Sequence, residues 1–222
     1  MLMVCPNALP VHVRYLGQAD YTSTYHAMQQ FTEKRDDNTI DELWVLEHFP
    51  VYTLGMAGKT EHLLNTKNIP VIKTDRGGQV TYHGLGQLVV YILVNIKRKH
   101  WSIKQLVNLL EQAIINYLNS HDLLAQRREK APGVYICDKK IASLGLRIRK
   151  GCSYHGISLN VNMDLTPFSG INPCGYAGLE VTQLSDLGIS KTVNQVSEEF
   201  LPHLLTLLEC YEKQELIQPD KC

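Results

Sequence analysis

The chain has 222 residues, and its 22 lysines and arginines are balanced by 22 aspartates and glutamates. A net charge of zero gives no general attraction to nucleic acid or to anionic membranes. No stretch approaches the roughly 18 apolar residues of a membrane-spanning helix, and residues 1–20 contain no recognisable secretory signal. Length and composition therefore predict one cytoplasmic domain, residues 1–222, with a large hydrophobic core.

The first half of the chain predicts one helix among several strands. Asp20 is a suitable N-cap for a helix that continues to about Arg35, where the polar run 36–38 ends it. Apolar runs bounded by proline, glycine and polar residues predict the strands. These strands are residues 11–16, 43–48, 51–54, 71–74 and 87–96.

The second half predicts two helices that flank a small antiparallel sheet. Residues 102–105 match a capping box, and apolar residues then keep helical spacing as far as Leu118. Val193 begins the second helical pattern, which extends to about Glu212 and which Pro202 should kink or divide. Residues 164–180 are too irregular for an element. The strands are 133–137 and 140–148, a hairpin across Asp138-Lys139, and 154–161.

These elements predict an α+β fold in a single domain, with a mixed, largely antiparallel sheet and helices packed on it. The six cysteines, at positions 5, 137, 152, 174, 210 and 222, show no Cys-x-x-Cys spacing. Their even number in a chain of this length is weak evidence for disulfides. The nine histidines form no metal-ligand pattern with each other or with cysteines. We therefore expect a reduced protein without a bound metal or cofactor.

Residues 76–84 have a composition that suits neither a buried strand nor a solvated loop. The segment combines two adjacent glycines with polar side chains and is followed by the apolar run 88–94. Glycines allow the backbone to approach another group closely or to adopt positive φ. We interpret the segment as the wall of a binding pocket. Its sequence is Arg76-Gly77-Gly78-Gln79-Val80-Thr81-Tyr82-His83-Gly84.

Cys174 is the cysteine whose surroundings best suit a nucleophile. It lies between Pro173, which fixes the approach of the chain, and Gly175, which permits a sharp turn. Cys137 and Cys152 lie in or beside predicted strands, where a cysteine is usually a small buried hydrophobic residue. From its context alone, Cys174 fits either a presented nucleophile or an inert buried thiol.

A nucleophilic thiol needs a neighbour that favours the thiolate, because a free cysteine has a pKa of about 8.5. Lys140 is a candidate, since it opens the apolar run 140–146, where a charged residue is unusual. A solvated turn lysine, like Lys139, is the alternative interpretation. His83 and His155 are the other candidate partners, although isolated histidines near aromatic residues are more often structural.

The common phosphate-binding and hydrolase motifs are absent from the sequence. There is no Gly-x-Gly-x-x-Gly fingerprint and no Gly-x-x-x-x-Gly-Lys-Ser/Thr phosphate loop. A Gly-x-Ser-x-Gly elbow and a papain-like cysteine signature are also missing. These absences argue against the most frequent nucleotide-binding and hydrolase classes without identifying a reaction.

Taken together, these segments resemble the octanoyltransferases, the lipoyl(octanoyl) transferase family of bacterial lipoate biosynthesis. The resemblance covers most of the chain, from about residue 11 to about residue 185. Its specificity comes from the joint occurrence of several motifs in one order. The motifs are residues 76–84 with Gly86, Gln87 and Tyr91, residues 131–135, 140–147 and 154–162, and Asn172-Pro173-Cys174-Gly175.

The resemblance implies a fold like that of the catalytic domains of biotin and lipoate protein ligases, with this core at about residues 35–212. It also implies transfer of an octanoyl group from octanoyl-acyl carrier protein to a lysine, with no need for ATP or a metal. The implied acceptors are the lipoyl domains of 2-oxoacid dehydrogenases and the glycine-cleavage H protein. No nucleic acid or membrane partner is expected.

The resemblance also implies roles for individual residues. Cys174 and Lys140 take the positions of the family's catalytic dyad, in which the cysteine carries the acyl group as a thioester. We expect His83 and His155 to shape the pocket, because the lysine already provides a base. The positions of the family's substrate contacts are Arg76, Gly77, Gly78, Gln79, Val80, Thr81, Tyr82, His83, Ser143, Leu144, Gly145, Gly156, Ile157 and Ser158.

Two other classes of function compete with this hypothesis. An ATP-dependent lipoate or biotin ligase of the same fold would use no covalent cysteine. It should also carry a Gly-Arg-Gly-Arg-type adenylate loop, which this sequence lacks. The second class is a non-catalytic module that only holds acyl chains. Covalent acylation of Cys174 without ATP separates the three.

Overall fold

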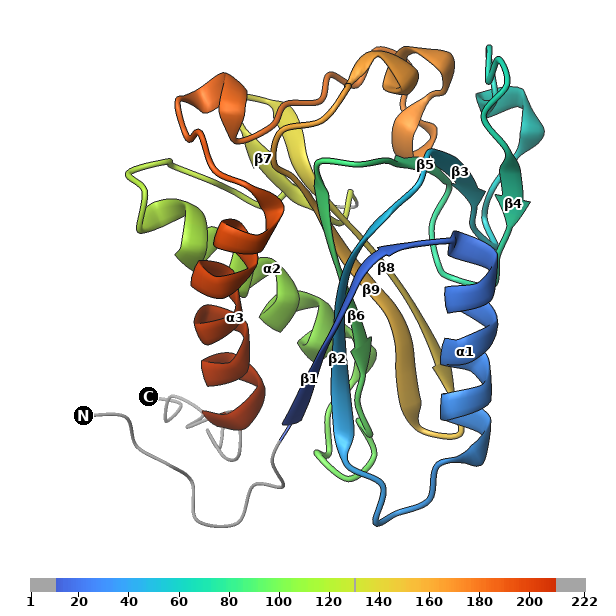
Figure 1. The fold of residues 1–222 in the computed structure, drawn as a ribbon, viewed down its shortest axis with the longest axis vertical. Coiled ribbons are helices and arrows are strands. Elements are labelled where there is room, and N and C mark those ends of the chain that lie inside the picture. Colours follow the sequence, from blue (N-terminus) through green and yellow to red (C-terminus); the bar gives the residue numbers. More distant parts are fainter. Residues whose placement is uncertain (1–10, 130, 211–222) are drawn as a thin grey trace, which may run out of the picture.

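The computed structural model describes residues 11–129 and 131–210, and a six-stranded sheet forms its centre (Figure 1). The strand order across this sheet is β1-β2-β6-β9-β8-β7. β1 and β2 are parallel, and the other neighbouring pairs are antiparallel, which confirms the predicted mixed sheet. The strands are β1 (Val11–Ala19), β2 (Asp41–His48), β6 (Gln87–Leu93), β7 (Val134–Ile136), β8 (Lys139–Arg149) and β9 (Cys152–Asn160).

A second sheet of three strands lies near one end of the first (Figure 1). β3 (Val51–Leu54) is parallel to β4 (Val71–Lys73) and antiparallel to β5 (Val80–His83). β5 lies inside the glycine-rich segment 76–84, which was not predicted to contain a strand. Gly77 and Gly78 precede β5, so the segment that was interpreted as a pocket wall is part loop and part strand.

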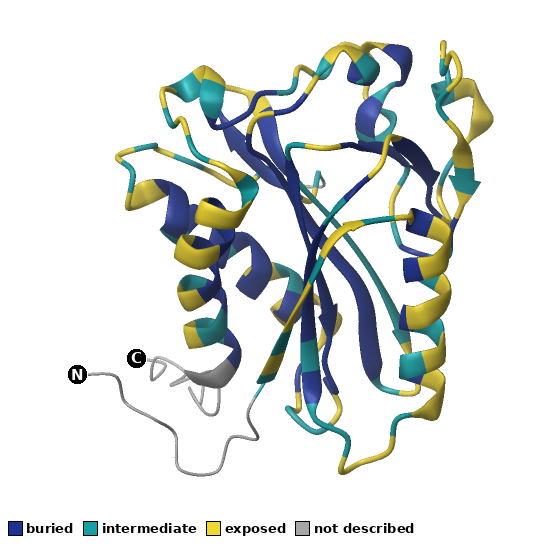
Figure 2. Cartoon of the chain, viewed as in Figure 1, coloured by how far each residue is buried: buried dark blue, intermediate teal, exposed yellow. Residues whose placement is uncertain are grey.

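Helices cover both faces of the central sheet (Figure 1). They are α1 (Tyr21–Lys34), α2 (Ile103–Asn119) and α3 (Val193–Cys210). Val45 and Val90 pack against α2 and α3, whereas Trp44 and Val89 pack against α1. Neighbouring residues of a strand point to opposite faces, so a strand that is buried on both sides is apolar throughout. Figure 2 shows this concentration of buried residues in the central strands.

The helix starts agree with the sequence pattern. Asp20 accepts the N–H of Ser23 at 2.8 Å, and both halves of the capping box between Ser102 and Gln105 are present. α3 runs unbroken through the exposed Pro202, so the predicted division of this helix is wrong. Fully buried side chains on both sides of the proline hold the two halves against the core. The predicted helical residues 211–212 lie outside the described residues.

Residues 133–161 form the antiparallel strands that the sequence predicted, and these strands are part of the main sheet. β9 pairs with the central strand β6 and thereby connects the β7–β8 hairpin to the rest. The hairpin turn is Cys137-Asp138, one residue earlier than predicted, because Ile136 pairs with Lys139. Both turn residues have positive φ, as the tight turns of two-residue hairpins require.

The segment after β9 returns across the end of the sheet and meets β8. Within residues 164–180, where the sequence predicted no regular element, it contains the short 3-10 turns η2 (Thr166–Gly170) and η3 (Pro173–Gly175). The N–H of Lys140 donates to the carbonyl of Glu180 at 2.9 Å, and the N–H of Thr182 donates to the carbonyl of Lys140 at 3.0 Å. These bonds fix the η3 segment beside the strand that carries Lys140.

No helix within residues 11–129 and 131–210 is long and apolar enough to cross a membrane.

Candidate active site

Cys174 lies at the apex of a tight turn with left-handed backbone geometry. Its φ is 57° and its ψ is 15°, and Gly175 follows with a φ of 80°. The N–H of Gly175 donates to the carbonyl of Asn172 at 3.0 Å, and the N–H of Tyr176 donates to the carbonyl of Pro173 at 3.1 Å. A left-handed conformation costs a non-glycine residue roughly 1–2 kcal/mol. The turn therefore presents the half-buried thiol at the expense of local strain.

The Lys140 side chain reaches this thiol from the second position of β8. Its Nζ donates to Cys174 Sγ at 2.8 Å and to the carbonyl of Pro132 at 2.8 Å. Lys140 is only 2% exposed, so its interpretation as a solvated turn lysine is wrong. None of the ion pairs among the described residues includes Lys140. A buried ammonium must have its protons hydrogen-bonded and its charge compensated, and Cys174 Sγ and the Pro132 carbonyl are the acceptors within reach of Lys140 Nζ.

The loop before β7 leaves space for the lysine. Gly133 has a φ of 142°, and a Cβ at this position would lie 2.5 Å from Lys140 Cε and 2.7 Å from the carbonyl oxygen of Ala142. The Gly133 N–H donates to Glu111 Oε1 at 2.9 Å, and Arg127 Nε donates to Glu111 Oε2 at 3.0 Å. A buried carboxylate of α2 thus anchors the loop whose Pro132 carbonyl holds Lys140.

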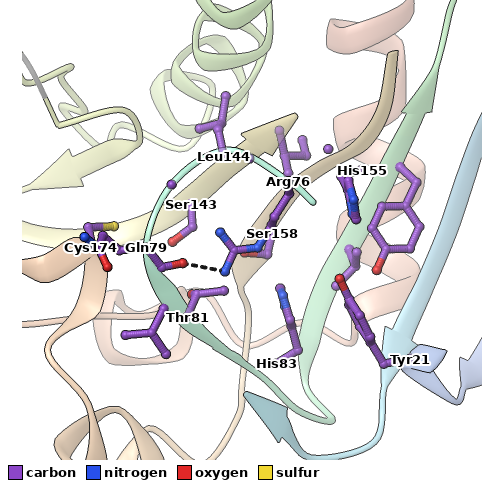
Figure 3. Close-up of a pocket in the computed structure, with 17 residues that line it drawn as sticks. Tyr21, Arg76, Gln79, Thr81, His83, Ser143, Leu144, His155, Ser158 and Cys174 are labelled. Carbon is purple, nitrogen blue, oxygen red and sulfur yellow. Dashed lines mark hydrogen bonds between the residues drawn. The ribbon is translucent and has the colours of Figure 1, made fainter. Parts of the chain in front are cut away.

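A cavity extends from Cys174 into the protein between β5, β6, β8, β9 and the start of α1 (Figure 3). In Figure 3 Cys174 lies at one end, and Tyr21 and His83 lie at the other. The residues that line the cavity are Tyr21, Arg76, Gly78, Gln79, Val80, Thr81, His83, Val89, Tyr91, Ser143, Leu144, Gly145, His155, Gly156, Ile157, Ser158 and Cys174.

The structure brings the predicted substrate contacts together around this cavity, apart from two. Gly77 instead lines a groove on the other side of Cys174. Tyr82 points away from the cavity and packs against Tyr52 and Phe168, with ring centroids 5.4 and 5.5 Å apart. Neighbours in a strand face opposite sides, so Thr81 and His83 cannot share a face with Tyr82. The motif alone did not reveal this alternation.

Tyr21, Val89, Tyr91 and His155 line the cavity but were not predicted as substrate contacts. Tyr21 is the first residue of α1 and reaches the site only through the tertiary fold, so no local signal marks it. Val89 and Tyr91 are two residues apart in β6 and therefore share a face. Tyr91 carries the one hydroxyl group in this apolar strand, and that hydroxyl could have identified it in the sequence as a residue of the site.

Arg76 shapes the glycine-rich segment from within. Its Nε and Nη2 donate to Thr53 Oγ1, Nη2 donates to the carbonyls of Thr53 and Gln79, and Nη1 donates to the carbonyl of Gly77. These acceptors are neutral, and no ion pair of the described residues includes Arg76. Burial lowers the pKa of Arg76, although a guanidinium keeps its proton in proteins. A second buried positive charge thus lies in the cavity wall that leads to Cys174.

His48 and His83, near the far end of the cavity, are neutral at pH 7. Burial lowers the pKa of His83 to about 3 and that of His48 to about 4. His48 Nδ1 lies 2.9 Å from the carbonyl of Ala19, which can only accept, so Nε2 accepts the Tyr91 hydroxyl at 2.6 Å. His83 Nδ1 donates to Gln87 Oε1 at 2.7 Å. Neutral, hydrogen-bonded rings of this kind give the cavity its shape without adding charge.

His155 is held by Asp75 at the same end of the cavity. Its Nε2 donates to Asp75 Oδ1 at 2.9 Å, and Nδ1 has no hydrogen-bond partner within the described residues. Burial alone would raise the pKa of Asp75, but hydrogen bonds from His155, Tyr154 and Tyr25 lower it well below its usual range. Burial in turn lowers the pKa of His155. This pair fixes the ring of His155 in the cavity wall.

The other described cysteines do not approach this arrangement. Cys152 is buried at the start of β9, and Cys137 is exposed in the hairpin turn, so the expectation of a buried Cys137 is wrong. Cys137, Cys152 and Cys174 are free. In the part of the chain that the structure describes, no cluster of three His, Cys, Asp or Glu residues could hold a metal ion.

Comparison with known proteins identifies the family. The model of the lipoyl protein ligase A/B catalytic domain matches residues 20–205. An octanoyltransferase of Laribacter hongkongensis is 58% identical over 198 residues, which are 89% of this chain and 96% of that protein. An octanoyltransferase of Chromobacterium violaceum is 57% identical over 88% of this chain and 95% of that protein. The chain belongs to the octanoyltransferase family. It is therefore an enzyme of the acyltransferase class.

Solved structures confirm the fold expected of this family. A putative lipoate protein ligase of Thermoplasma acidophilum superimposes with a TM-score of 0.72 at 16% identity, covering 89% of this chain and 85% of that one. A biotin protein ligase of Aquifex aeolicus gives a TM-score of 0.58 at 16% identity, covering 91% and 72%. At this level of identity the likeness concerns the fold alone.

A methyl group at Gly133 should displace Lys140 from the thiol. We expect Gly133→Ala to slow alkylation of Cys174 by iodoacetamide near neutral pH roughly tenfold, because the ammonium loses its contact with the sulfur. Peptide mass mapping after a short reaction measures the rate. Gly188→Ala is the matched control, since Gly188 also has positive φ (86°) but nothing lies within 4 Å of its added Cβ. Equal rates in both variants would contradict the role of Gly133.

Proposed function

We propose that this chain transfers the octanoyl group from octanoyl-acyl carrier protein to a specific lysine of lipoyl domains, through a thioester on Cys174. The acceptors are the lipoyl domains of 2-oxoacid dehydrogenases and the glycine-cleavage H protein, and the reaction takes place in the cytoplasm. The observation that carries this proposal is the 2.8 Å contact from Lys140 Nζ to Cys174 Sγ at the mouth of a buried cavity. Membership of the octanoyltransferase family supports the choice of acyl group.

In the first half of the reaction the Cys174 thiolate attacks the carbonyl carbon of the donor thioester. A bond forms between Sγ and the carbonyl carbon, and the bond from that carbon to the carrier's sulfur breaks. The leaving thiolate takes a proton from the ammonium of Lys140, which becomes a neutral amine. Exchange of one thioester for another is close to neutral in free energy, so the step requires no ATP.

In the second half the neutral Lys140 acts as the base. It takes a proton from the ammonium of the acceptor lysine, which then attacks the acyl carbonyl as a neutral amine. The bond between Sγ and the acyl carbon breaks, and the Cys174 thiolate is restored beside the Lys140 ammonium. The amide nitrogen releases its remaining extra proton to solvent, so the dyad returns to its starting state.

The buried cavity is the proposed site of the acyl chain. Each methylene that leaves water contributes about 0.8 kcal/mol, so an eight-carbon chain gains substantially from burial. The far end of the wall carries neutral groups such as His83, and the guanidinium of Arg76 is already bonded to neutral acceptors of the protein.

The two competing classes of function explain fewer features of the site. An ATP-dependent ligase of this fold has no need of a thiol that is paired with a buried lysine. The solved ligases share only 16–17% identity with this chain, whereas the octanoyltransferases share 55–58%. A module that only holds acyl chains would gain nothing from a strained left-handed residue at Cys174.

Covalent acylation of Cys174 is the first expected outcome. Mixing the protein with octanoyl-acyl carrier protein in the absence of ATP should add one octanoyl group to the intact mass, because the thiolate needs no other activation. Cys174→Ala should gain no adduct. Cys137→Ala is the matched control and should still be acylated, since Cys137 is an exposed thiol in the hairpin turn. No adduct on the wild type, or an unchanged adduct on Cys174→Ala, would overturn the proposal.

Removal of the Lys140 ammonium should slow the reactions of the Cys174 thiol by an amount that depends on pH. Lys140→Met keeps an unbranched side chain but leaves the thiolate without its buried cation, so octanoylation near neutral pH should fall about a hundredfold. Alkylation of Cys174 by iodoacetamide should need a higher pH to reach its maximum rate. Lys139→Met is the matched control, because Lys139 is exposed and pairs with Glu180 at 3.0 Å. Identical pH–rate profiles for wild type and Lys140→Met would contradict the assigned role.

A further inference from the structure

A second hollow meets the acyl cavity at Cys174, and we propose that it receives the pantetheine arm of the acyl donor. The inference rests on the proposed function, because it takes the octanoyl group to lie in the buried cavity. The second hollow, called here the arm groove, has a volume of about 330 Å³. It shares Gly78, Gln79, Leu144, Gly145 and Cys174 with the buried cavity, called here the acyl cavity, so the two hollows meet at the same sulfur.

The walls of the arm groove are apolar and come from separate parts of the chain. Ile103 and Val107 lie one turn apart at the start of α2, Leu146 belongs to β8, and Tyr176 directly follows the turn that carries Cys174. A pantetheine arm consists of methylene and dimethyl groups between amides. Its aliphatic parts therefore match these side chains.

The two hollows differ in how they reach solvent. At the mouth of the arm groove Ile103 is 53% exposed and Tyr176 is 47% exposed. At the far end of the acyl cavity Tyr21 is 3% exposed and His155 is 1% exposed. An acyl chain that is still attached to a carrier protein must approach from the open side, because the carrier cannot enter the buried end.

Attack on a thioester requires two paths that lead away from the carbonyl carbon, one for the acyl chain and one for the donor sulfur with its arm. The carbonyl carbon carries the acyl chain on one side and the donor sulfur with its arm on the other. When the bond to Cys174 Sγ forms, both substituents are still attached, and they diverge from the same carbon. The acyl cavity accommodates one substituent, and the arm groove accommodates the other. When the bond to the donor sulfur breaks, the released thiolate takes its proton from Lys140 Nζ, which lies 2.8 Å from Cys174 Sγ.

The test compares two octanoyl thioesters that differ only in the leaving arm. Octanoyl-pantetheine carries the full arm, whereas the ethyl thioester of octanoic acid carries almost none. Val107→Trp narrows the groove, and Ile103→Trp narrows its mouth at an exposed position where folding should not suffer. Leu124→Trp is the matched control, because Leu124 is 89% exposed and lies outside both hollows. Thermal unfolding verifies that each variant is folded.

We expect both groove variants to lower the rate of Cys174 acylation by octanoyl-pantetheine about tenfold relative to the rate with the ethyl thioester. In Leu124→Trp that ratio should equal the wild-type ratio. Equal slowing with both donors in Val107→Trp and Ile103→Trp would mean that the groove holds the acyl chain, which overturns the inference. Unchanged rates with both donors in both variants would overturn it as well, because the arm then enters elsewhere.

The failure of this inference is distinguishable from the failure of the proposed function. If the wild type forms no octanoyl adduct with either thioester or with octanoyl-acyl carrier protein, the acyl-enzyme itself is wrong and the inference falls with it. If the wild type is acylated and only the donor comparison fails, the acyl-enzyme stands and the path of the arm is wrong.

Discussion

The buried contact between Lys140 and Cys174 is the constraint on which the rest of the site depends. An ammonium that is 2% exposed and belongs to no ion pair of the described residues is tolerable only if its protons are bonded and its charge is balanced. The Pro132 carbonyl meets the first need, and in the proposed mechanism the Cys174 thiolate meets the second. Gly133 provides the space, and Glu111 of α2 anchors the loop.

This constraint links elements that are distant in the sequence. Cys174 belongs to a segment that pairs with β8 through Glu180 and Thr182, so thiol and lysine are fixed by the same backbone bonds. The cavity then extends along the sheet from this fixed point. Arg76 holds the glycine-rich wall through neutral acceptors, and neutral histidines close the far end. In the proposed function, the reactive atoms and the binding wall are thus separate parts that meet at one sulfur.

Much of the fold and the dyad could be predicted from the sequence, because helix caps, apolar periodicity and the motif order are local signals. Tyr21 could not, since its place in the wall depends on how α1 packs on the sheet. Tyr82 was misplaced because a strand alternates its faces within what looked like one loop. The position of the hairpin turn at Cys137 depended on cross-strand register, which the sequence specifies only weakly.

The most direct measurement is a crystal structure of the protein after reaction with an octanoyl thioester. We expect a thioester bond at Cys174 Sγ, with the chain passing Arg76 toward Tyr21 and with Lys140 Nζ still beside the sulfur. An acyl group on any other residue would contradict this expectation. A chain that leaves Cys174 through the groove beside Val107, with the cavity toward Tyr21 unfilled, would contradict it equally.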